Sequence, residues 1–207
     1  GSINISEDKY IHGLSRLADA IKNNGSVAVL QLIHSGVQAW VEQAVGPSAI
    51  GRIEGKPIST AKNPRALSTE EVEQYIEDFG TAAYRAKMAG FDMVQVHGTH
   101  GYLIMNFLSP NTNKRIDNYG VDRDRFPVEI VKNIKNKCGA NYPVIYRLCA
   151  NETLGDKLMK EGITIEDAEK TATKLEKAGV DAFNVTGGSD DVIHLYFPSS
   201  YVLDGDE

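Results

Sequence analysis

The chain has 207 residues, of which 42% are apolar and 24% charged, which is ordinary for a globular domain with a hydrophobic core. Its formal net charge of −6 comes from acids and bases mixed along the chain, and this argues against a nucleic-acid partner. No apolar run is long enough for a membrane span, and the first residues lack the pattern of a signal peptide. We therefore expect a cytoplasmic protein without a membrane partner.

The first third of the chain predicts a helix, a strand and a long loop. Apolar residues recur at about 3.6-residue spacing from Asp8 to Asn24, as in an amphipathic helix. The apolar run Val27 to Ile33 has the length of a strand and is typical of one buried on both faces of a parallel sheet. Residues 34–67 carry glycines and prolines without a sustained period, which predicts a loop lying over a functional site.

Three more helix and strand pairs follow. A capping-box pattern at Ser68 opens a helix that stops at Gly90, ahead of a strand at 91–96. A helix at 124–137 precedes a strand at 143–148, and a helix opened by Thr164 precedes a strand at 180–185. The segment Ala89 to Gly98 is echoed by Ala178 to Gly187, which supports a regular alternation of helices and strands.

This alternation predicts an α/β fold, either a (β/α)₈ TIM barrel or a doubly wound sheet. Four predicted strands are fewer than the eight of a closed barrel, so residues 1–207 would form a single partial TIM-barrel domain of about four βα units. Exposed edges of buried parallel strands are unfavourable. Further sequence, a homo-oligomer or a rearranged packing would have to cover them.

Polar residues gather at the carboxyl ends of the predicted strands, where barrels of this kind hold their active sites. They are Gln31, His34, His97, His100, Tyr102, Arg147 and Thr186. We assign His34 no chemical role, because packing beneath the loop explains it equally well. The candidates for binding and catalysis are Gln31, His97, His100, Tyr102 and Arg147.

The densest cluster runs from His97 to Tyr102 and admits three interpretations. A metal site would need a third ligand and a different spacing, and neither Cys138 nor Cys149 supplies one; we expect both cysteines to be reduced and buried. A structural histidine pair is the second interpretation. In the third, His97 and His100 hold a carbonyl oxygen that gains negative charge while Tyr102 delivers a proton, which suits reduction of a conjugated double bond.

Four blocks in this order resemble the signature blocks of the Old Yellow Enzyme family. They are Gln31-Leu32-Ile33-His34-Ser35-Gly36, Gly46-Pro47-Ser48-Ala49-Ile50, His97-Gly98-Thr99-His100-Gly101-Tyr102-Leu103 and the segment from Phe107 to Gly120. The second histidine of the third block is similar to the bacterial NADH:flavin oxidoreductase and 2,4-dienoyl-CoA reductase branch. The resemblance covers almost the whole chain.

The resemblance implies FMN as cofactor and NADH or NADPH as reductant. Gln31 would bind the flavin pyrimidine ring, and Arg147 would lie near flavin N1 and O2, where positive charge stabilises the reduced form. His97 and His100 would hold an enone or enoyl substrate. Tyr102 would then protonate its α-carbon after flavin N5 passes hydride to the β-carbon.

The same resemblance implies that part of the barrel is missing. The family's first two strands would precede residue 1, and its last two strands, with the phosphate-binding loops, would follow Glu207. No iron-sulfur cluster is encoded in this chain. The alternative is a catalytically inactive folded fragment that does not bind flavin by itself. A flavin-free lyase would need a Schiff-base lysine or metal ligands at a strand end, which we do not find.

Two departures from the family pattern bear on local structure. Val37 stands where the family usually has arginine, which removes one charge near the strand end. The stretch from Tyr119 to Arg123 is shorter than usual. The shortening raises the question of how the helix before Phe126 is capped.

Overall fold

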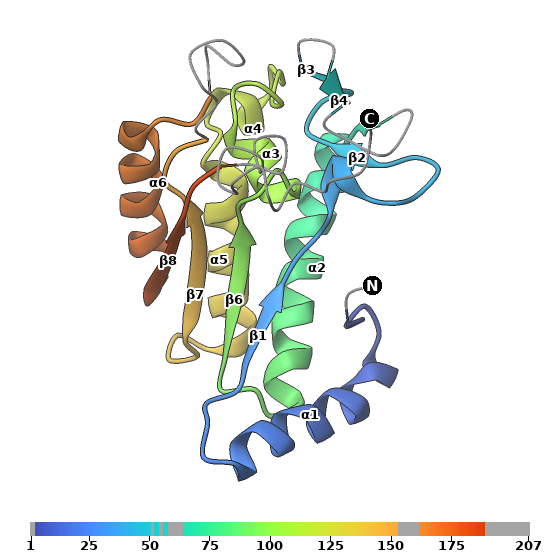
Figure 1. The fold of residues 1–207 in the computed structure, drawn as a ribbon, viewed down its shortest axis with the longest axis vertical. Coiled ribbons are helices and arrows are strands. Elements are labelled where there is room, and N and C mark those ends of the chain that lie inside the picture. Colours follow the sequence, from blue (N-terminus) through green and yellow to red (C-terminus); the bar gives the residue numbers. More distant parts are fainter. Residues whose placement is uncertain (1–2, 51, 54–55, 58–63, 153–161, 189–207) are drawn as a thin grey trace, which may run out of the picture.

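The computed structural model describes residues 3–50, 52–53, 56–57, 64–152 and 162–188, shown in Figure 1. Its centre is a parallel sheet of four strands in the order β1-β6-β7-β8. The strands are β1 (Val29–Leu32), β6 (Met93–Gly98), β7 (Val144–Cys149) and β8 (Ala182–Thr186). All four predicted strands are thereby confirmed. Relative to the sequence pattern, β1, β6 and β8 begin two residues later and β7 begins one residue later.

The long helices cover one face of this sheet. They are α2 (Thr69–Met88), α5 (Arg125–Cys138) and α6 (Ile165–Ala178), whereas α1 (Ile11–Asn23) lies at the end where the strands begin (Figure 1). A short 3₁₀ turn, η1 (Asp8–Tyr10), leads into α1, and capping boxes at Ser68 and Thr164 open α2 and α6. One-sided coverage is the arrangement of a barrel arc, whereas a doubly wound sheet has helices on both faces. The fold is a partial TIM barrel.

We call the sheet face opposite the helices the inner face. It is defined by strand register and by alternation along each strand. Side chains of the other face, such as Val94, Val144 and Tyr146, are fully buried beneath the helices. The inner face comprises Val29, Gln31, Met93, Gln95, His97, Ile145, Arg147, Cys149, Ala182, Asn184 and Thr186.

The expectation that the first strand is buried on both faces is wrong. Val27 and Val29 are 60% and 39% exposed, and Gln31 is exposed as well, whereas Leu32 beneath the helices is buried. The reason is that no described residue covers the inner face at β1. A continuous apolar run is typical of a strand that is covered on both faces, as in a closed barrel. In the described residues, the helices cover only one face of this sheet.

The stretch 34–67 contains more structure than the predicted loop. It includes a 3₁₀ turn, η2 (Gly36–Gln38), and two short strand pairs. Of these, β2 (Val45–Gly46) pairs with β5 (Arg65–Ala66), and β3 (Arg52–Ile53) pairs with β4 (Lys56–Pro57). Such two-residue strands leave no periodic signature in the sequence. The remainder of the stretch lies outside the described residues.

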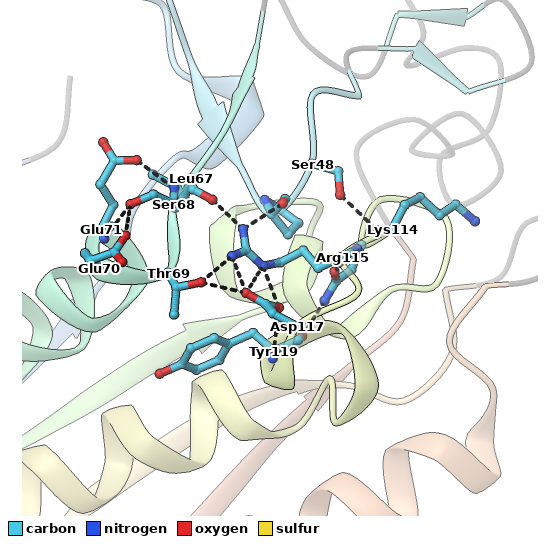
Figure 2. A network of polar contacts seen from close by, with 12 residues as sticks. Ser48, Leu67, Ser68, Thr69, Glu70, Glu71, Lys114, Arg115, Asp117 and Tyr119 are labelled. Atoms are coloured by element: carbon cyan, nitrogen blue, oxygen red, sulfur yellow. Dashed lines mark hydrogen bonds and ion pairs between the residues drawn. The ribbon is translucent and has the colours of Figure 1, made fainter.

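A buried arginine ties the stretch 34–67 to the segment after β6 (Figure 2). The Arg115 guanidinium donates to the main-chain oxygens of Pro47 and Leu67 and to the Asp117 carboxylate, which also accepts the Thr69 hydroxyl at 2.9 Å. The Arg115 side chain is only 9% exposed. Burying a cation is costly unless it is fully paired, so this network fixes three segments relative to one another.

The internal repeat in the sequence corresponds to a repeated clamp at the lower end of the sheet, where strands begin. The Asp92 main chain donates to Ala28 O at 2.9 Å while its carboxylate accepts from Ala28 N at 2.8 Å. Asp181 makes the same two bonds with Val144, at 2.9 and 2.8 Å. Each aspartate also pairs with a lysine of a preceding helix, Lys22 or Lys135.

Two short helices, α3 (Leu103–Leu108) and α4 (Asn118–Val121), follow β6 and were not predicted. All six residues of α3 are buried, so it lacks the polar face that marks a surface helix in sequence. In the shortened segment, Asp117 caps α4 by accepting from Tyr119 N. Asp124 precedes α5 without a side-chain cap bond; its carboxylate instead accepts the Thr171 hydroxyl and pairs with Lys174.

Candidate functional site

The predicted site residues lie at the upper end of the sheet, where the strands end. His97 of β6 and Arg147 of β7 are register partners, and Asn184 of β8 continues the same row. Gln31 of β1 pairs with Gln95, two positions below His97 on the same face. The inner face therefore brings Gln31, His97 and Arg147 together, although they are far apart in sequence.

His100 and Tyr102 reach this end through the turn between β6 and α3. His100 has φ +58° and Gly101 has φ +73°, and His100 is the one non-glycine residue with positive φ in the described part of the chain. The His97 ring packs edge-on against both rings, with centroids 5.3 Å from His100 and 5.0 Å from Tyr102. Three of the five predicted residues thus form one aromatic cluster.

Glycine at position 98 allows β6 to pass close to β7. A Cβ at Gly98 would lie 2.2 Å from the hydroxyl of Tyr146, so any larger residue would displace that ring. Tyr146 is fully buried, and burial raises the pKa of its phenol above the ordinary value. The glycine therefore lets the end of β6 and its histidine turn sit directly against the end of β7.

His97 is a neutral hydrogen-bond donor in this environment. It is 4% exposed, and its pKa falls to about 4, first because burial disfavours the charged ring and then because His100 and Arg147 are near. Its Nδ1 lies 3.4 Å from the amide N–H of Thr99, which it accepts. The ring proton is consequently on Nε2, which is the nitrogen left to donate to a ligand.

His34, to which we assigned no chemical role, makes contacts that support the local structure. Its Nδ1 accepts from Gly36 N at 3.0 Å, and its ring contacts Tyr75 of α2 edge-on at 4.9 Å. Burial lowers the pKa of His34, against an opposing effect of Asp78. Gly36 itself has φ +59°, and a Cβ there would meet the backbone of Leu103 at 2.8 Å.

Two predicted cofactor residues have side chains with unused hydrogen-bonding capacity. Arg147 Nε is buried and has no hydrogen-bond partner among the described residues. Gln31 is exposed on the same inner face, on β1, with β6 between it and Arg147 of β7. Buried donors are rarely left unsatisfied in a complete protein, so the Arg147 donor points to a ligand at this end.

Sequence reasoning missed two residues that contact His100. Gln38 of η2 donates from Nε2 to the His100 carbonyl at 2.9 Å. The hydroxyl of Thr186, which ends β8, lies 3.5 Å from His100 Nε2. Thr186 was noted only as a polar strand end, and Gln38 stands in a stretch without a period, so neither contact had a signal in the sequence.

The described part of the chain gives three further findings on sites and partners. It contains no group of three or more histidine, cysteine or acidic residues able to hold a metal ion. Both Cys138 and Cys149 are buried and free. No helix within this part is long and apolar enough to cross a membrane.

Comparisons with known proteins identify the family and agree with the fold. The profile of the NADH:flavin oxidoreductase / NADH oxidase family matches residues 1–202. An NADH oxidase of Thermoanaerobacter brockii is 37% identical over 191 residues, or 90% of this chain and 28% of that protein. An NADPH dehydrogenase of Geobacillus sp. (strain WCH70) is 34% identical over 192 residues, or 90% of this chain and 53% of that protein.

A solved structure of a 2-naphthoyl-CoA reductase with 2-naphthoyl-CoA superposes with a TM-score of 0.80 at 30% identity, covering 92% of this chain and 31% of that one. The chain thus spans between 28% and 53% of the length of these relatives. The resemblance read from four sequence blocks is confirmed. This chain belongs to the NADH:flavin oxidoreductase / NADH oxidase family, within the Old Yellow Enzyme group.

Proposed function

We propose that the protein containing this chain is an FMN-dependent oxidoreductase that reduces the C=C bond of an α,β-unsaturated carbonyl compound with electrons from NADH or NADPH. The observation that carries the proposal is the packing of the His97, His100 and Tyr102 rings at the end of β6. This cluster adjoins the face that carries Gln31 and Arg147.

The inner face fits a flavin. The Arg147 guanidinium offers a buried Nε donor with no partner in the described residues, and the Gln31 amide offers both a donor and an acceptor. These groups suit the carbonyl and imide edge of the flavin pyrimidine ring, with Arg147 near the atoms that carry negative charge after reduction. When bound, the flavin accepts hydride from the nicotinamide and supplies it to the substrate's β-carbon.

His97 and His100 would hold the substrate's carbonyl oxygen. His97 donates through Nε2, because its Nδ1 is occupied by Thr99 N–H. With its pKa near 4, the His97 ring stays neutral at neutral pH and acts as a fixed dipole aimed at the oxygen. Such a donor favours the transition state, in which the oxygen gains negative charge, over the ground-state carbonyl.

Tyr102 would supply the proton. The centroid of the Tyr102 ring lies 5.0 Å from that of the His97 ring, and this edge-on contact holds the phenol beside the histidines. Tyr102 is also the N-cap residue of α3. The phenol Oη would give its proton to the α-carbon, on the side of the substrate opposite the incoming hydride. A general acid of this kind typically contributes about 10²- to 10⁴-fold in rate.

The substrate class follows from the same chemistry. Two ring donors suit one carbonyl oxygen, as in an enone or an enoyl thioester. One structural relative was solved with a 2-naphthoyl-CoA thioester, which supports an acyl thioester or enone for this protein too. Relatives named for NADH and for NADPH leave both reductants within the proposal.

The test is Tyr102→Phe in the flavin-loaded protein, with the two half-reactions measured by stopped-flow absorbance. Oxidation of reduced flavin by an enone should slow about 10²- to 10⁴-fold, whereas reduction by NAD(P)H should change little. Tyr84→Phe, an exposed tyrosine on α2, is the matched control. Equal slowing of both half-reactions would show that Tyr102 is not the proton donor.

A second candidate concerns the isolated chain: a folded fragment that does not retain flavin. It is supported by the exposure of β1 on its inner face and by the 28% of the Thermoanaerobacter relative that the chain spans. Incubating residues 1–207 with FMN and desalting tests it. Loss of the flavin absorbance supports the fragment, and stoichiometric retention contradicts it.

A further inference from the structure

We propose that Gln38 and Thr186 are positioning residues for His100: Gln38 fixes its main chain and Thr186 orients its ring towards the substrate. This inference rests on the proposed function and adds two residues to that site. It is carried by the two contacts to His100 and by its positive φ.

The His100 main chain needs support because of its conformation. A φ of +58° is unfavourable for a residue with a side chain, and such residues persist where the surroundings hold them in place. Gln38 supplies this support by donating to the His100 carbonyl at 2.9 Å. Because Gln38 lies in η2, which follows β1, the turn after β6 is held from the strand next to it in the sheet.

The His100 ring is contacted from the opposite side. Thr186 ends β8, two strands away from β6, yet its hydroxyl is 3.5 Å from His100 Nε2. The turn after β6 therefore extends over β7, whose Cys149 is the register partner of Thr186. A distance of 3.5 Å is at the long end for a hydrogen bond, and such contacts at catalytic groups often shorten when substrate binds.

The Gln38 contact fixes the main chain of His100, and the Thr186 contact fixes the orientation of its ring. A left-handed main chain alone sets where the Cβ of His100 points, but the ring can still rotate about its side-chain bonds. The hydroxyl of Thr186 limits that rotation by engaging one ring nitrogen. With both in place, His100 and the neutral His97 keep their edge-on contact, with centroids 5.3 Å apart, before substrate arrives.

The first experiment compares Thr186→Val with Thr186→Ser in the flavin-loaded protein. Valine keeps the shape but removes the hydroxyl, so we expect KM for an enone to rise about two- to tenfold, the range of one net hydrogen bond. Serine keeps the hydroxyl and should restore the wild-type value. Thr173→Val, an exposed threonine of α6, makes the same chemical change away from the site and should have no effect.

A background without the imidazole shows whether Thr186 acts through His100. In His100→Gln, adding Thr186→Val should cause no further rise in KM, because the group being positioned is gone. Gln38→Met should raise KM in the same way as Thr186→Val, with Gln43→Met, exposed in the same loop, as its control. A rise in KM from Thr186→Val that persists undiminished in His100→Gln would overturn the inference.

A second readout does not depend on enone reduction. Nitrogen NMR of the histidine rings, assigned with His100→Gln, should show the His100 Nε2 signal moving in Thr186→Val and returning in Thr186→Ser. An unchanged Nε2 signal in Thr186→Val would overturn the positioning role. If the NMR result holds while the wild-type protein fails to reduce any enone, the proposed function fails and the contact stands.

Discussion

The polar residues at the two ends of the sheet differ in how completely their hydrogen-bonding groups are paired. At the lower end, Asp92 and Asp181 each pair with a main-chain N–H and a lysine. At the upper end, Arg147 Nε is buried with no partner in the described residues, and His100 has an unfavourable φ. Satisfied groups stabilise a fold, whereas unsatisfied and strained ones cost stability and persist at sites that bind something.

The comparison gives each end its role. The same pair of hydrogen bonds occurs at the start of two strands, made by Asp92 and by Asp181. Such a repeat is expected of contacts that hold successive βα units together. The upper residues do not repeat, and each strand contributes a different chemical group. This division follows the general rule for such barrels, in which one end supports stability and the other carries chemistry.

The largest effect should come from the support beneath the upper end. Arg115→Met removes the cation that is paired with the Asp117 carboxylate, and it leaves the main-chain oxygens of Pro47 and Leu67 without this donor. We expect a loss of about 3–5 kcal/mol in the free energy of unfolding, measured with urea. Arg16→Met on exposed α1 is the matched control. A loss below about 1 kcal/mol would mean that the network is solvated and dispensable.

Removing a polar group at the upper end of the sheet should weaken FMN binding without lowering the stability of the protein. Arg147→Met should weaken FMN binding about ten- to a hundredfold, since hydrogen bonds to charged groups contribute about 1.5–3 kcal/mol. Its thermal stability without flavin should not fall, because the variant deletes a buried unsatisfied donor. Flavin fluorescence titration and melting curves measure the two effects. A destabilised apoprotein with unchanged FMN affinity would place Arg147 among the structural residues.

Sequence and structure agree most closely where pattern and burial coincide. The capping boxes at Ser68 and Thr164 and the strands after them could be predicted because each has a local cause. The exposure of Val29 on the inner face and the buried helix α3 could not be predicted. Both depend on which other parts of the chain pack against these residues, and local sequence does not show this. The candidate site residues could be proposed from the kinds of side chain at the predicted strand ends. The contacts of Gln38 and Thr186 with His100 could not, because they depend on the path of the turn after β6.

Substitution in a clamp at the lower end should have the opposite pattern of effects to Arg147→Met: it should lower stability without changing FMN affinity. In Asp181, burial would raise the carboxyl pKa, but the Lys135 and Val144 hydrogen bonds outweigh it and lower the pKa below its usual 3.8. Asp181→Asn should therefore cost about 0.5–1 kcal/mol of stability and leave FMN affinity unchanged. The wild-type advantage is complete above about pH 4 and is lost as pH falls through the lowered pKa. An advantage that instead grew below pH 4 would contradict the ion pair.

The smallest effect concerns the charge on His97. Because burial, then His100 and Arg147, lower its pKa from 6.5 to about 4, the ring should remain neutral throughout the range in which ordinary histidines titrate. Histidine NMR across that range should show no transition of His97 until about pH 4. A transition near 6.5 would show that the ring is solvated, and the neutral donor assigned to it would be wrong.

The most direct test of the division between the two ends is the absorbance spectrum of the protein containing residues 1–207 after incubation with FMN and desalting. We compare wild type with a Gln31→Leu/Arg147→Met variant at the upper end and an Asp92→Asn/Asp181→Asn variant at the lower end. The bands of oxidised flavin should persist in wild type and in the lower-end variant and disappear in the upper-end variant. Retention of flavin by the upper-end variant, or equal loss from both variants, would contradict the assignment of the flavin site to the carboxyl ends of the strands.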